Sequence, residues 1–237
     1  MTQQWRFIPP LRASGAVQMA LDRWLLQQHR LGNHPSTLRF YTWSPAAISL
    51  GHHQKRFPEF WRELSWEGNP LDLVRRPTGG RAVLHQGDLT YMVVTSGLGG
   101  NPRKAYLEIC EFLIEGWRSL GVELQYGEAK RNYIHNANCF ATATGADLID
   151  SQGNKLIGSA QLRQSDAILQ HGSMALDTNE QLFTQVFAEP PPPKRIFFPE
   201  KIVQTLTESA IRCLKIELII QPLTQMEWKE VLISVQH

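Results

Sequence analysis

The feature that most constrains the fold is a series of strand-like runs joined by very short turns. The runs ADLID (146–150) and KLIGSAQLRQ (155–164) flank the turn SQGN, and AILQHGSMAL (167–176) follows after two residues. Strands joined by such short turns pair antiparallel, because a parallel pair needs a crossover of a dozen residues or more. Strands and helices do not alternate regularly. The pattern therefore predicts an α+β fold with a largely antiparallel sheet.

Further strand-like runs occur in the first half of the chain. TLRFYTW (37–43) and AAISLG (46–51) are separated by the turn signal SP, and LDLVRR (71–76) follows a tryptophan-rich connection. The runs RAVLH (81–85) and LTYMVV (89–94) are joined by the tight sequence QGD, which predicts a hairpin.

Amphipathic patterns predict four helices. Residues 14–29 begin at a Ser cap, and residues 104–120 carry apolar side chains at helical spacing. A third helix over 199–214 is opened by proline, which the first helical turn tolerates. Thr224 and Glu227 have the spacing of a capping box, which predicts a last short helix. Before these two helices, EPPPPK breaks the periodicity and is expected to cross the surface.

The composition is typical of a soluble globular protein. With 237 residues, 42% hydrophobic and 19% charged, the chain is long enough for a sizeable core. We expect one domain over 1–237, with a short C-terminal helical extension after about residue 193. A net charge of +2 is too small to indicate non-specific nucleic-acid binding. Because no apolar run reaches the length of a membrane span and MTQQWRFIPP lacks the form of a secretory signal, we expect a cytoplasmic protein with no membrane partner.

The three cysteines lie in different surroundings. Cys110 and Cys213 fall in helical, apolar patterns and are interpreted as small buried hydrophobic residues. Cys139 lies in NANCFATAT, which is neither alternating nor helical, and basic residues upstream together with Lys155 downstream would favour its thiolate. Whether Cys139 is a nucleophile stays open on this pattern alone. The spacing contains no CxxC, so neither a zinc site nor another metal site is indicated.

One candidate binding segment is RRPTGGRAVLHQGDLTY, residues 75–91. It places three arginines and two adjacent glycines between strand-like runs. Glycine permits close approach of a ligand, and backbone N–H groups beside arginines can hold an anion or a carbonyl oxygen. A Gly-Gly turn with solvated arginines explains the pattern equally well. The spacing of a phosphate-binding Walker loop is absent.

A second candidate segment is GNKLIGSAQLRQSDAILQHGSMAL, residues 153–176. Lys155 opens a strand and is followed by Gly158, Ser159 and Ala160, which fill a core poorly and leave room for a groove. The ammonium group of Lys155 can bind a carbonyl or a phosphate, although a solvated lysine at a strand end is the commoner case. His171 is similarly ambiguous, because a lone histidine is more often structural than catalytic.

These segments together resemble a known family. RRPTGGRAVLH followed by LTY, and then KLIGSAQLRQ and LQHGSMAL, is similar to the catalytic domain shared by lipoate protein ligases, lipoyl and octanoyl transferases and, more distantly, biotin protein ligases. The resemblance runs from about Met19 to Leu176 and includes MALDRWLL and LRFYTWSPAAISLGHHQ. It implies a mixed, mostly antiparallel sheet flanked by helices. It also implies a narrow tunnel for a medium-length acyl chain between the glycine loop and the lysine strand.

The resemblance implies a set of site residues. Cys139 and Lys155 would be catalytic, with Lys155 in contact with the acyl carbonyl or an adenylate. The small residues would leave space for the acyl chain. The residues expected to bind substrate are Arg76, Gly79, Gly80, Arg81, His85, Gly158, Ser159, Ala160, Gln161 and His171.

The position of the cysteine distinguishes branches of the family. A cysteine ahead of the GNKLIGSAQ strand resembles the octanoyltransferases that carry their nucleophile in that loop. The other octanoyltransferase type has its cysteine after the lysine motif, and here no cysteine lies between Cys139 and Cys213. ATP-dependent ligases typically read GGGAVxHDxGN, whereas this chain reads GGRAVLHQGDLTY. Asp88 also stands where the family's HxxELTY motif has a glutamate.

The function implied by the resemblance is transfer of an octanoyl group from octanoyl-acyl carrier protein, through a thioester on Cys139, to a lysine of a lipoyl-domain protein. No cofactor is expected, because a thioester is already activated. Three alternatives stay open: a lipoate ligase that uses ATP and Mg, an amidotransferase between two lipoyl domains, and a binding module without turnover.

Overall fold

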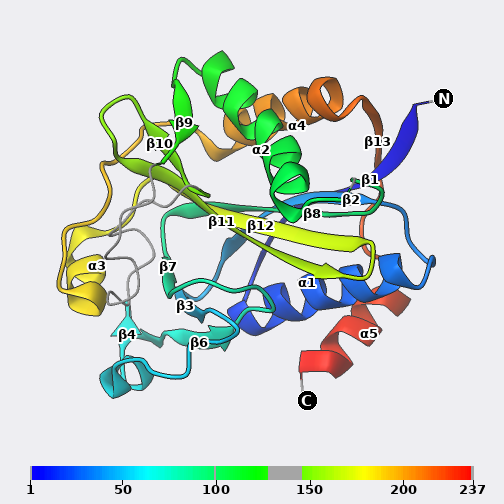
Figure 1. The fold of residues 1–237 in the computed structure, drawn as a ribbon. Coiled ribbons are helices and arrows are strands. Elements are labelled where there is room, and N and C mark those ends of the chain that lie inside the picture. Colours follow the sequence, from blue (N-terminus) through cyan, green and yellow to red (C-terminus); the bar gives the residue numbers. More distant parts are fainter. Residues whose placement is uncertain (1, 99, 128–145, 236–237) are drawn as a thin grey trace.

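The main element of the fold is an eight-stranded sheet. The structure is a computed structural model that describes residues 2–98, 100–127 and 146–235. Its large sheet consists of β1 (Gln3–Ala13), β2 (Thr37–Trp43), β8 (Asp88–Thr95), β9 (Leu124–Tyr126), β10 (Leu148–Asp150), β11 (Lys155–Gln164), β12 (Ala167–Ala175) and β13 (Ile216–Ile220). They follow the order β13-β1-β2-β8-β12-β11-β10-β9 (Figure 1). Among these described strands, five of the seven neighbouring pairs are antiparallel, which confirms the predicted fold class.

The series of short-turn strands forms as predicted. β10 and β11 pair antiparallel across the turn SQGN, and β11 and β12 pair from Ile157 opposite Met174 to Gln164 opposite Ala167. The pairing of β10 with β11 extends only to Ile157. Within the described chain, β11 from Gly158 onward is therefore paired by β12 alone.

The parallel pairs lie at one edge of the sheet. β1 pairs with β2 on one side and with β13 on the other, with Gln3 opposite Ile216 and Phe7 opposite Ile220. Neither β1 nor β13 is predicted from the sequence. The segment after residue 193 thus contains a strand of the main sheet between its two helices.

The predicted hairpin between RAVLH and LTYMVV is wrong. β7 (Val83–His85) joins a separate three-stranded sheet with β3 (Ala47–Leu50) and β6 (Asp72–Arg75), whereas β8 lies in the large sheet. The chain changes sheets at Gly87, which has a φ of +68°, and a Cβ there would lie 2.0 Å from the Asp177 carbonyl oxygen. Glycine is required at this crossing because its backbone passes directly against another segment.

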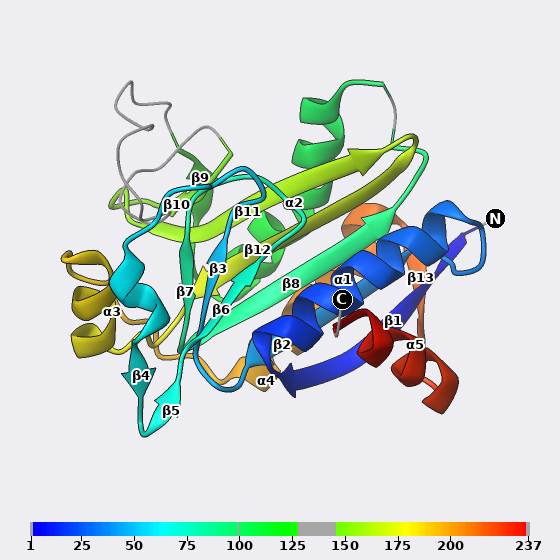
Figure 2. The ribbon, with the colours of Figure 1, turned by 90° about the horizontal axis from the view of Figure 1, so that it is seen from below.

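Helices cover both faces of the large sheet. α2 (Pro102–Ser119) and α4 (Pro199–Leu214) lie on one face, and α1 (Gly15–Arg30) and α5 (Gln225–Val235) lie on the other (Figures 1 and 2). These four helices agree with the predicted ranges. The capping box of α5 also forms: the Thr224 N–H donates to Glu227 Oε2 at 2.7 Å, and the Glu227 N–H donates to Thr224 Oγ1 at 3.2 Å.

Strand alternation divides the core into two layers. In β8, Tyr91 and Val93 pack with α2 and α4, while Met92 and Val94 pack with α1. Successive side chains of a strand point to opposite faces, so one strand supplies both layers. A third cluster lies under the small sheet, where α3 (Glu180–Phe187), η1 (Glu59–Arg62) and the ribbon of β4 (Ser65–Trp66) and β5 (Asn69–Pro70) pack.

None of the helices in the described ranges is both long and apolar enough to cross a membrane. The cytoplasmic location stays a prediction.

Candidate active site

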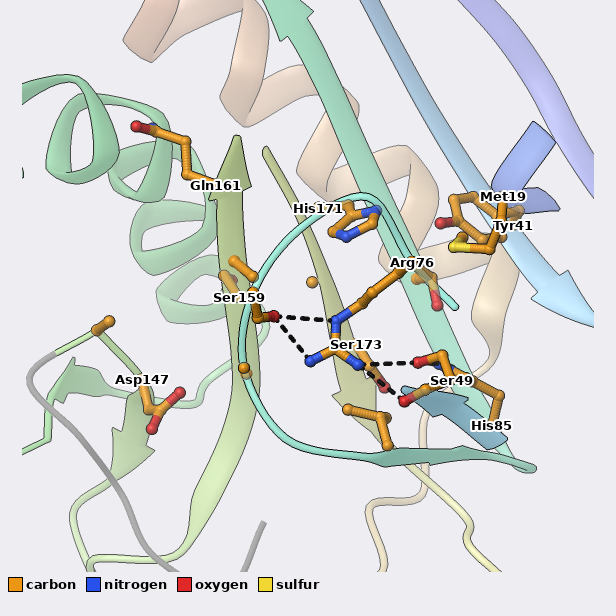
Figure 3. A pocket seen from close by; sticks show the side chains of 18 of the residues that line it. Met19, Tyr41, Ser49, Arg76, His85, Asp147, Ser159, Gln161, His171 and Ser173 are labelled. Carbon is orange, nitrogen blue, oxygen red and sulfur yellow. Dashed lines mark hydrogen bonds between the residues drawn. The ribbon is translucent and has the colours of Figure 1, made fainter. Parts of the chain in front are cut away.

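A cavity of about 340 Å³ opens between the loop after β6, strand β11 and the outward face of β12 (Figure 3). Its apolar wall comes from α1, β2 and the small sheet, through Met19, Tyr41, Trp43 and Val83. Nine of the residues predicted to bind substrate line it, namely Arg76, Gly79, Gly80, His85, Gly158, Ser159, Ala160, Gln161 and His171. The two sequence segments singled out above therefore face each other across one cavity.

The Arg76 side chain holds the glycine loop over the cavity. Its guanidinium donates to the carbonyl oxygens of Ser49 (2.8 Å), Gly79 (2.9 Å) and Arg81 (2.6 Å). Charge-assisted hydrogen bonds of this kind are roughly twice as strong as neutral ones. The buried guanidinium of Arg76 thus fixes the conformation of the glycine loop.

The two loop glycines have different reasons to lack a side chain. Gly80 has a φ of +98°, and a Cβ there would lie 2.7 Å from Arg76 Nη2. The backbone and Arg76 thus give Gly80 a reason to lack a side chain that is independent of the acyl chain expected to pass there. A Cβ on Gly79 would meet no heavy atom within 4 Å, so Gly79 borders open space.

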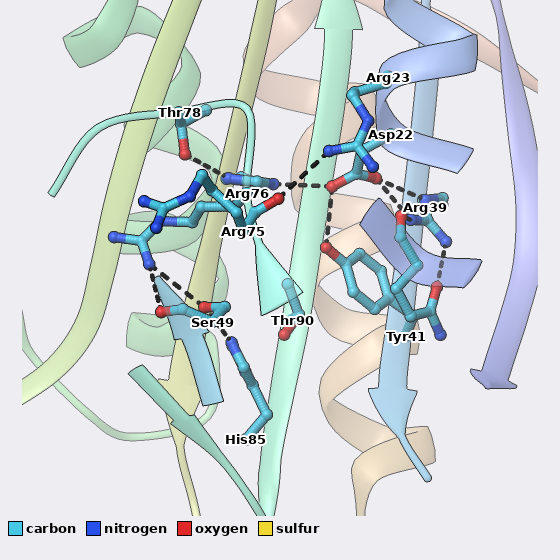
Figure 4. Close-up of polar contacts among 12 residues, drawn as sticks. Asp22, Arg23, Arg39, Tyr41, Ser49, Arg75, Arg76, Thr78, His85 and Thr90 are labelled. Atoms are coloured by element: carbon cyan, nitrogen blue, oxygen red, sulfur yellow. Dashed lines mark hydrogen bonds and ion pairs between the residues drawn. The ribbon is translucent and has the colours of Figure 1, made fainter. Parts of the chain in front are cut away.

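Ser49 and His85 line the cavity and form a hydrogen-bonded chain with Asp88. Figure 4 shows the contact between Ser49 and His85. Burial lowers the pKa of His85, and Asp88 opposes this only in part, so the imidazole is neutral near pH 7. Its Nδ1 lies 2.8 Å from Asp88 Oδ2 and carries the proton, because a carboxylate accepts hydrogen bonds. The Ser49 hydroxyl then donates to Nε2, 2.8 Å away. The ring also stacks on Trp43, with centroids 3.8 Å apart, which fixes its orientation.

A second chain of the same form lies on the α1 side. His171 Nδ1 donates to Asp22 Oδ2 at 2.7 Å, and Thr78 Oγ1 lies 2.6 Å from His171 Nε2 (Figure 4). Burial alone would raise the pKa of Asp22, but the charge of Arg39 and the hydrogen bond from His171 lower it below its usual value. Tyr41 also donates to Asp22 at 3.0 Å, so this buried carboxylate is fully paired.

Hydrogen-bonded polar groups continue along β11 and β12. Tyr91 donates to Ser159 Oγ at 2.9 Å, and Gln170 donates to the Tyr91 oxygen at 3.0 Å and to Cys110 Sγ at 3.4 Å. Burial raises the pKa of the Cys110 thiol to about 12. Cys110 is therefore an unreactive buried thiol, as predicted, and Cys213 packs half-buried against the same core.

Of the two residues predicted to be catalytic, the structure describes only Lys155. The Lys155 ammonium is buried and forms an ion pair with Asp147 Oδ1 at 2.9 Å, and Asp147 lines the cavity (Figure 3 labels Asp147). Lys155 itself is not among the lining residues, and it is connected to the cavity through its ion pair with Asp147. Cys139 lies outside the described residues. Arg81 is buried and borders the loop, but it is not among the lining residues.

Several polar residues of the site are missed by sequence reasoning. Ser49 and Thr78 lie in a strand and a loop where a hydroxyl has no distinctive pattern. Of these residues, only Asp22 could have been identified from the sequence, because it is a carboxylate on the buried face of a helix, between Met19 and Leu25. Among the described residues, no group of three or more His, Cys, Asp or Glu side chains is arranged to hold a metal ion.

The family model described as the lipoyl protein ligase A/B catalytic domain matches residues 14–235. The chain belongs to this family.

Relatives within the lipoyl ligase family are octanoyltransferases. Octanoyltransferase LipM of Halalkalibacterium halodurans is 39% identical over 199 residues, which cover 79% of this chain and 71% of that protein. LipM of Oceanobacillus iheyensis is 30% identical over 98% of this chain and 93% of its own length. A solved structure of lipoate-protein ligase A bound with ATP has a TM-score of 0.79 at 19% identity, covering 100% of this chain and 95% of that one. At that identity the structural likeness shows the fold alone.

Proposed function

We infer that this chain is an octanoyltransferase of protein lipoylation. The observation that carries the inference is its similarity to LipM octanoyltransferases, which is 39% identity over 79% of the chain in one relative and 30% identity over 98% of the chain in another. The enzyme is an acyltransferase, and its site is the cavity between the glycine loop and β11.

The cavity suits a medium-length acyl chain. Its apolar wall, contributed by Met19, Tyr41, Trp43 and Val83, is deep in the molecule, whereas Gly79 and Gln161 lie at its outer side. Burying each methylene of an acyl chain contributes about 0.8 kcal/mol. A chain that fills the apolar part therefore gains binding free energy with every carbon that it buries.

For the chemistry, Cys139 is the nucleophile of our proposal. Its thiolate attacks the carbonyl carbon of an octanoyl thioester, and the C–S bond to the donor breaks, so that the donor leaves as a thiolate and takes up a proton. The amine of an acceptor lysine then attacks the octanoyl-Cys139 thioester. An amide bond forms, Cys139 leaves as thiolate, and the amine loses its proton. Covalent catalysis divides one transfer between two macromolecules into two simpler encounters.

The described residues support this chemistry from the cavity wall. Lys155, held by Asp147 at 2.9 Å, is proposed to polarise the acyl carbonyl once substrate draws it away from that carboxylate. His85 is neutral and hydrogen-bonded on both nitrogens, so it presents no charge to the acyl chain. Removing a donor that stabilises an oxyanion typically costs about 3–4 kcal/mol of barrier, which sets the scale expected for loss of Lys155.

The proposed partners are octanoyl-acyl carrier protein as donor and a lipoyl-domain protein as acceptor. A thioester donor needs no ATP or metal, so none is included in the proposal. A ligase that uses ATP and Mg with free octanoic acid, and an amidotransferase that takes the acyl group from another lipoyl domain, differ from it only in the donor.

The test is a donor comparison on pure protein. Octanoyl-acyl carrier protein without ATP is expected to give an octanoyl mass adduct, which Cys139→Ala lacks and the control Cys110→Ala retains. Octanoylation of a lipoyl domain follows on adding the acceptor. Transfer by Cys139→Ala, or transfer only with Mg-ATP and free octanoic acid, would show the proposed mechanism to be wrong.

A further inference from the structure

A second depression adjoins the cavity and is strongly basic. It has a volume of about 1010 Å³ and lies between the exposed side of α1 and the loops that follow β3 and β6. We call it the basic groove and define it by Arg23, Arg30, His52, His53 and Arg75. Of the described residues that line it, none is acidic.

The positive charge of the basic groove is not compensated. Arg23 and Arg30 lie seven residues apart on α1 and therefore on one face of the helix. Arg23 donates to the Arg75 carbonyl at 3.2 Å (Figure 4). Arg75 in turn donates to the carbonyls of Gly51 (2.7 Å) and Gln54 (2.8 Å). Those partners are neutral, and no ion pair to a carboxylate of the described chain is formed by Arg23, Arg30 or Arg75.

The positive charge is concentrated in the basic groove and is not a property of the whole chain. The whole chain has a net charge of only +2, so the groove does not simply reflect an excess of basic residues. A surface of one sign attracts a partner of the opposite sign and speeds its encounter. The basic groove therefore fits an acidic macromolecule.

The groove is continuous with the cavity. Arg76, Gly79 and Gln161 line both. A partner bound in the groove consequently lies at the mouth of the acyl site.

The distance along β11 decides which partner fits. Gln161 in the groove and Lys155 at the reaction end are six residues apart, which is about 20 Å at the rise of a strand. The side chain of an acceptor lysine is far shorter than that. The phosphopantetheine arm of a carrier protein, with a phosphate and two amides in series, is long enough to cross it.

We propose that the basic groove docks the acidic carrier protein that donates the acyl group, with its arm laid along β11 into the cavity. This inference rests on the proposed function, because it takes the reaction end to be that of Lys155. A lipoyl-domain lysine held in the groove would fall short of that end, so the acceptor is not placed in the groove.

The test separates the two half-reactions. The variant Arg23→Glu/Arg30→Glu is compared with a control of equal charge change, Lys201→Glu/Arg212→Glu, on the exposed side of α4 at the other face of the sheet. Acyl-enzyme formation from octanoyl-acyl carrier protein at low salt is followed by mass spectrometry. The groove variant is expected to lose about 10-fold or more in its second-order rate constant, and this loss shrinks as salt is added. The control keeps the wild-type rate.

Two further measurements assign the effect. Acyl-enzyme formation from octanoyl-pantetheine, which has no protein part, is expected to be the same in wild type and groove variant. Transfer from preformed acyl-enzyme to a lipoyl domain is also expected to be unchanged. An unaltered rate with the carrier protein, or a loss confined to the acceptor step, overturns the docking proposal while the proposed function stands. Absence of acyl-enzyme in the wild type instead overturns the proposed function and the docking with it.

Discussion

Replacing Gly172 with alanine tests how closely β11 and β12 pack beside the cavity. Gly172 pairs with Ser159, and a Cβ at this position would lie 2.4 Å from Ser159 Oγ, 2.7 Å from Tyr91 Cε1 and 2.8 Å from the Gly158 carbonyl oxygen. The hydroxyl can rotate away, but the buried ring and the strand carbonyl cannot move without shifting β11. Overpacking of this kind costs about 1–3 kcal/mol.

The loss of unfolded-chain entropy opposes this destabilisation and has to be subtracted from it. Replacing glycine by alanine reduces the entropy of the unfolded chain and stabilises by about 0.4–1 kcal/mol where the site accepts a Cβ. For Gly172→Ala the clash exceeds this gain, which leaves a net loss of about 1–2 kcal/mol. For a chain of this length that lowers Tm by about 2–8 °C.

The control is Gly79→Ala, at the opposite wall of the same cavity. A Cβ there meets no heavy atom within 4 Å, and Gly79 has no positive φ, so only the entropic gain applies. Differential scanning calorimetry should therefore show that Tm is lowered by Gly172→Ala and unchanged or raised by Gly79→Ala. Equal shifts for the two variants would refute the packing argument.

Three further predictions concern single residues. Thr224→Ala removes the cap of α5 and should lower the free energy of unfolding by about 1 kcal/mol in urea titrations, whereas Thr224→Ser should not. The pKa of His85 is lowered in the fold from its usual 6.5, so as pH falls the imidazole takes up a proton in the unfolded chain before it does so in the folded protein. The free energy of unfolding should therefore decline below about pH 6.5, and this decline should be smaller in His85→Gln. Cys110, whose pKa is raised to about 12, should resist iodoacetamide at pH 8 in the native protein and react after unfolding, as peptide mass mapping would show; native labelling would contradict its burial.

Local signals in the sequence identify several elements and much of the site. The proline at 199, the capping pair Thr224 and Glu227 and the turn SQGN each act within a few residues, and each marks its element in the structure. The glycine loop and the lysine strand also face one cavity, because the motifs lie on segments that the antiparallel sheet brings together.

What the sequence misses depends on contacts between distant residues. Gly87 looks like a hairpin turn, but its close contact with Asp177 directs the chain from one sheet to the other. Asp22 becomes a partner of His171 only when α1 packs on the sheet, 149 residues away in sequence. No pattern within a short window contains either fact.

The parallel pairing of β1 with β13 has a consequence for synthesis of the chain. β1 is made before its outer partner, Ile216–Ile220, which emerges from the ribosome about two hundred residues later. The buried ion pair between Arg6 and Glu227, at 2.6 Å, spans the same interval. Pairings between such distant residues form slowly, and an unpaired strand edge is prone to pair with other chains. During translation, the nascent protein therefore exposes an open β-edge along β1 until Ile216–Ile220 has been made, and this edge is where a chaperone would most benefit it.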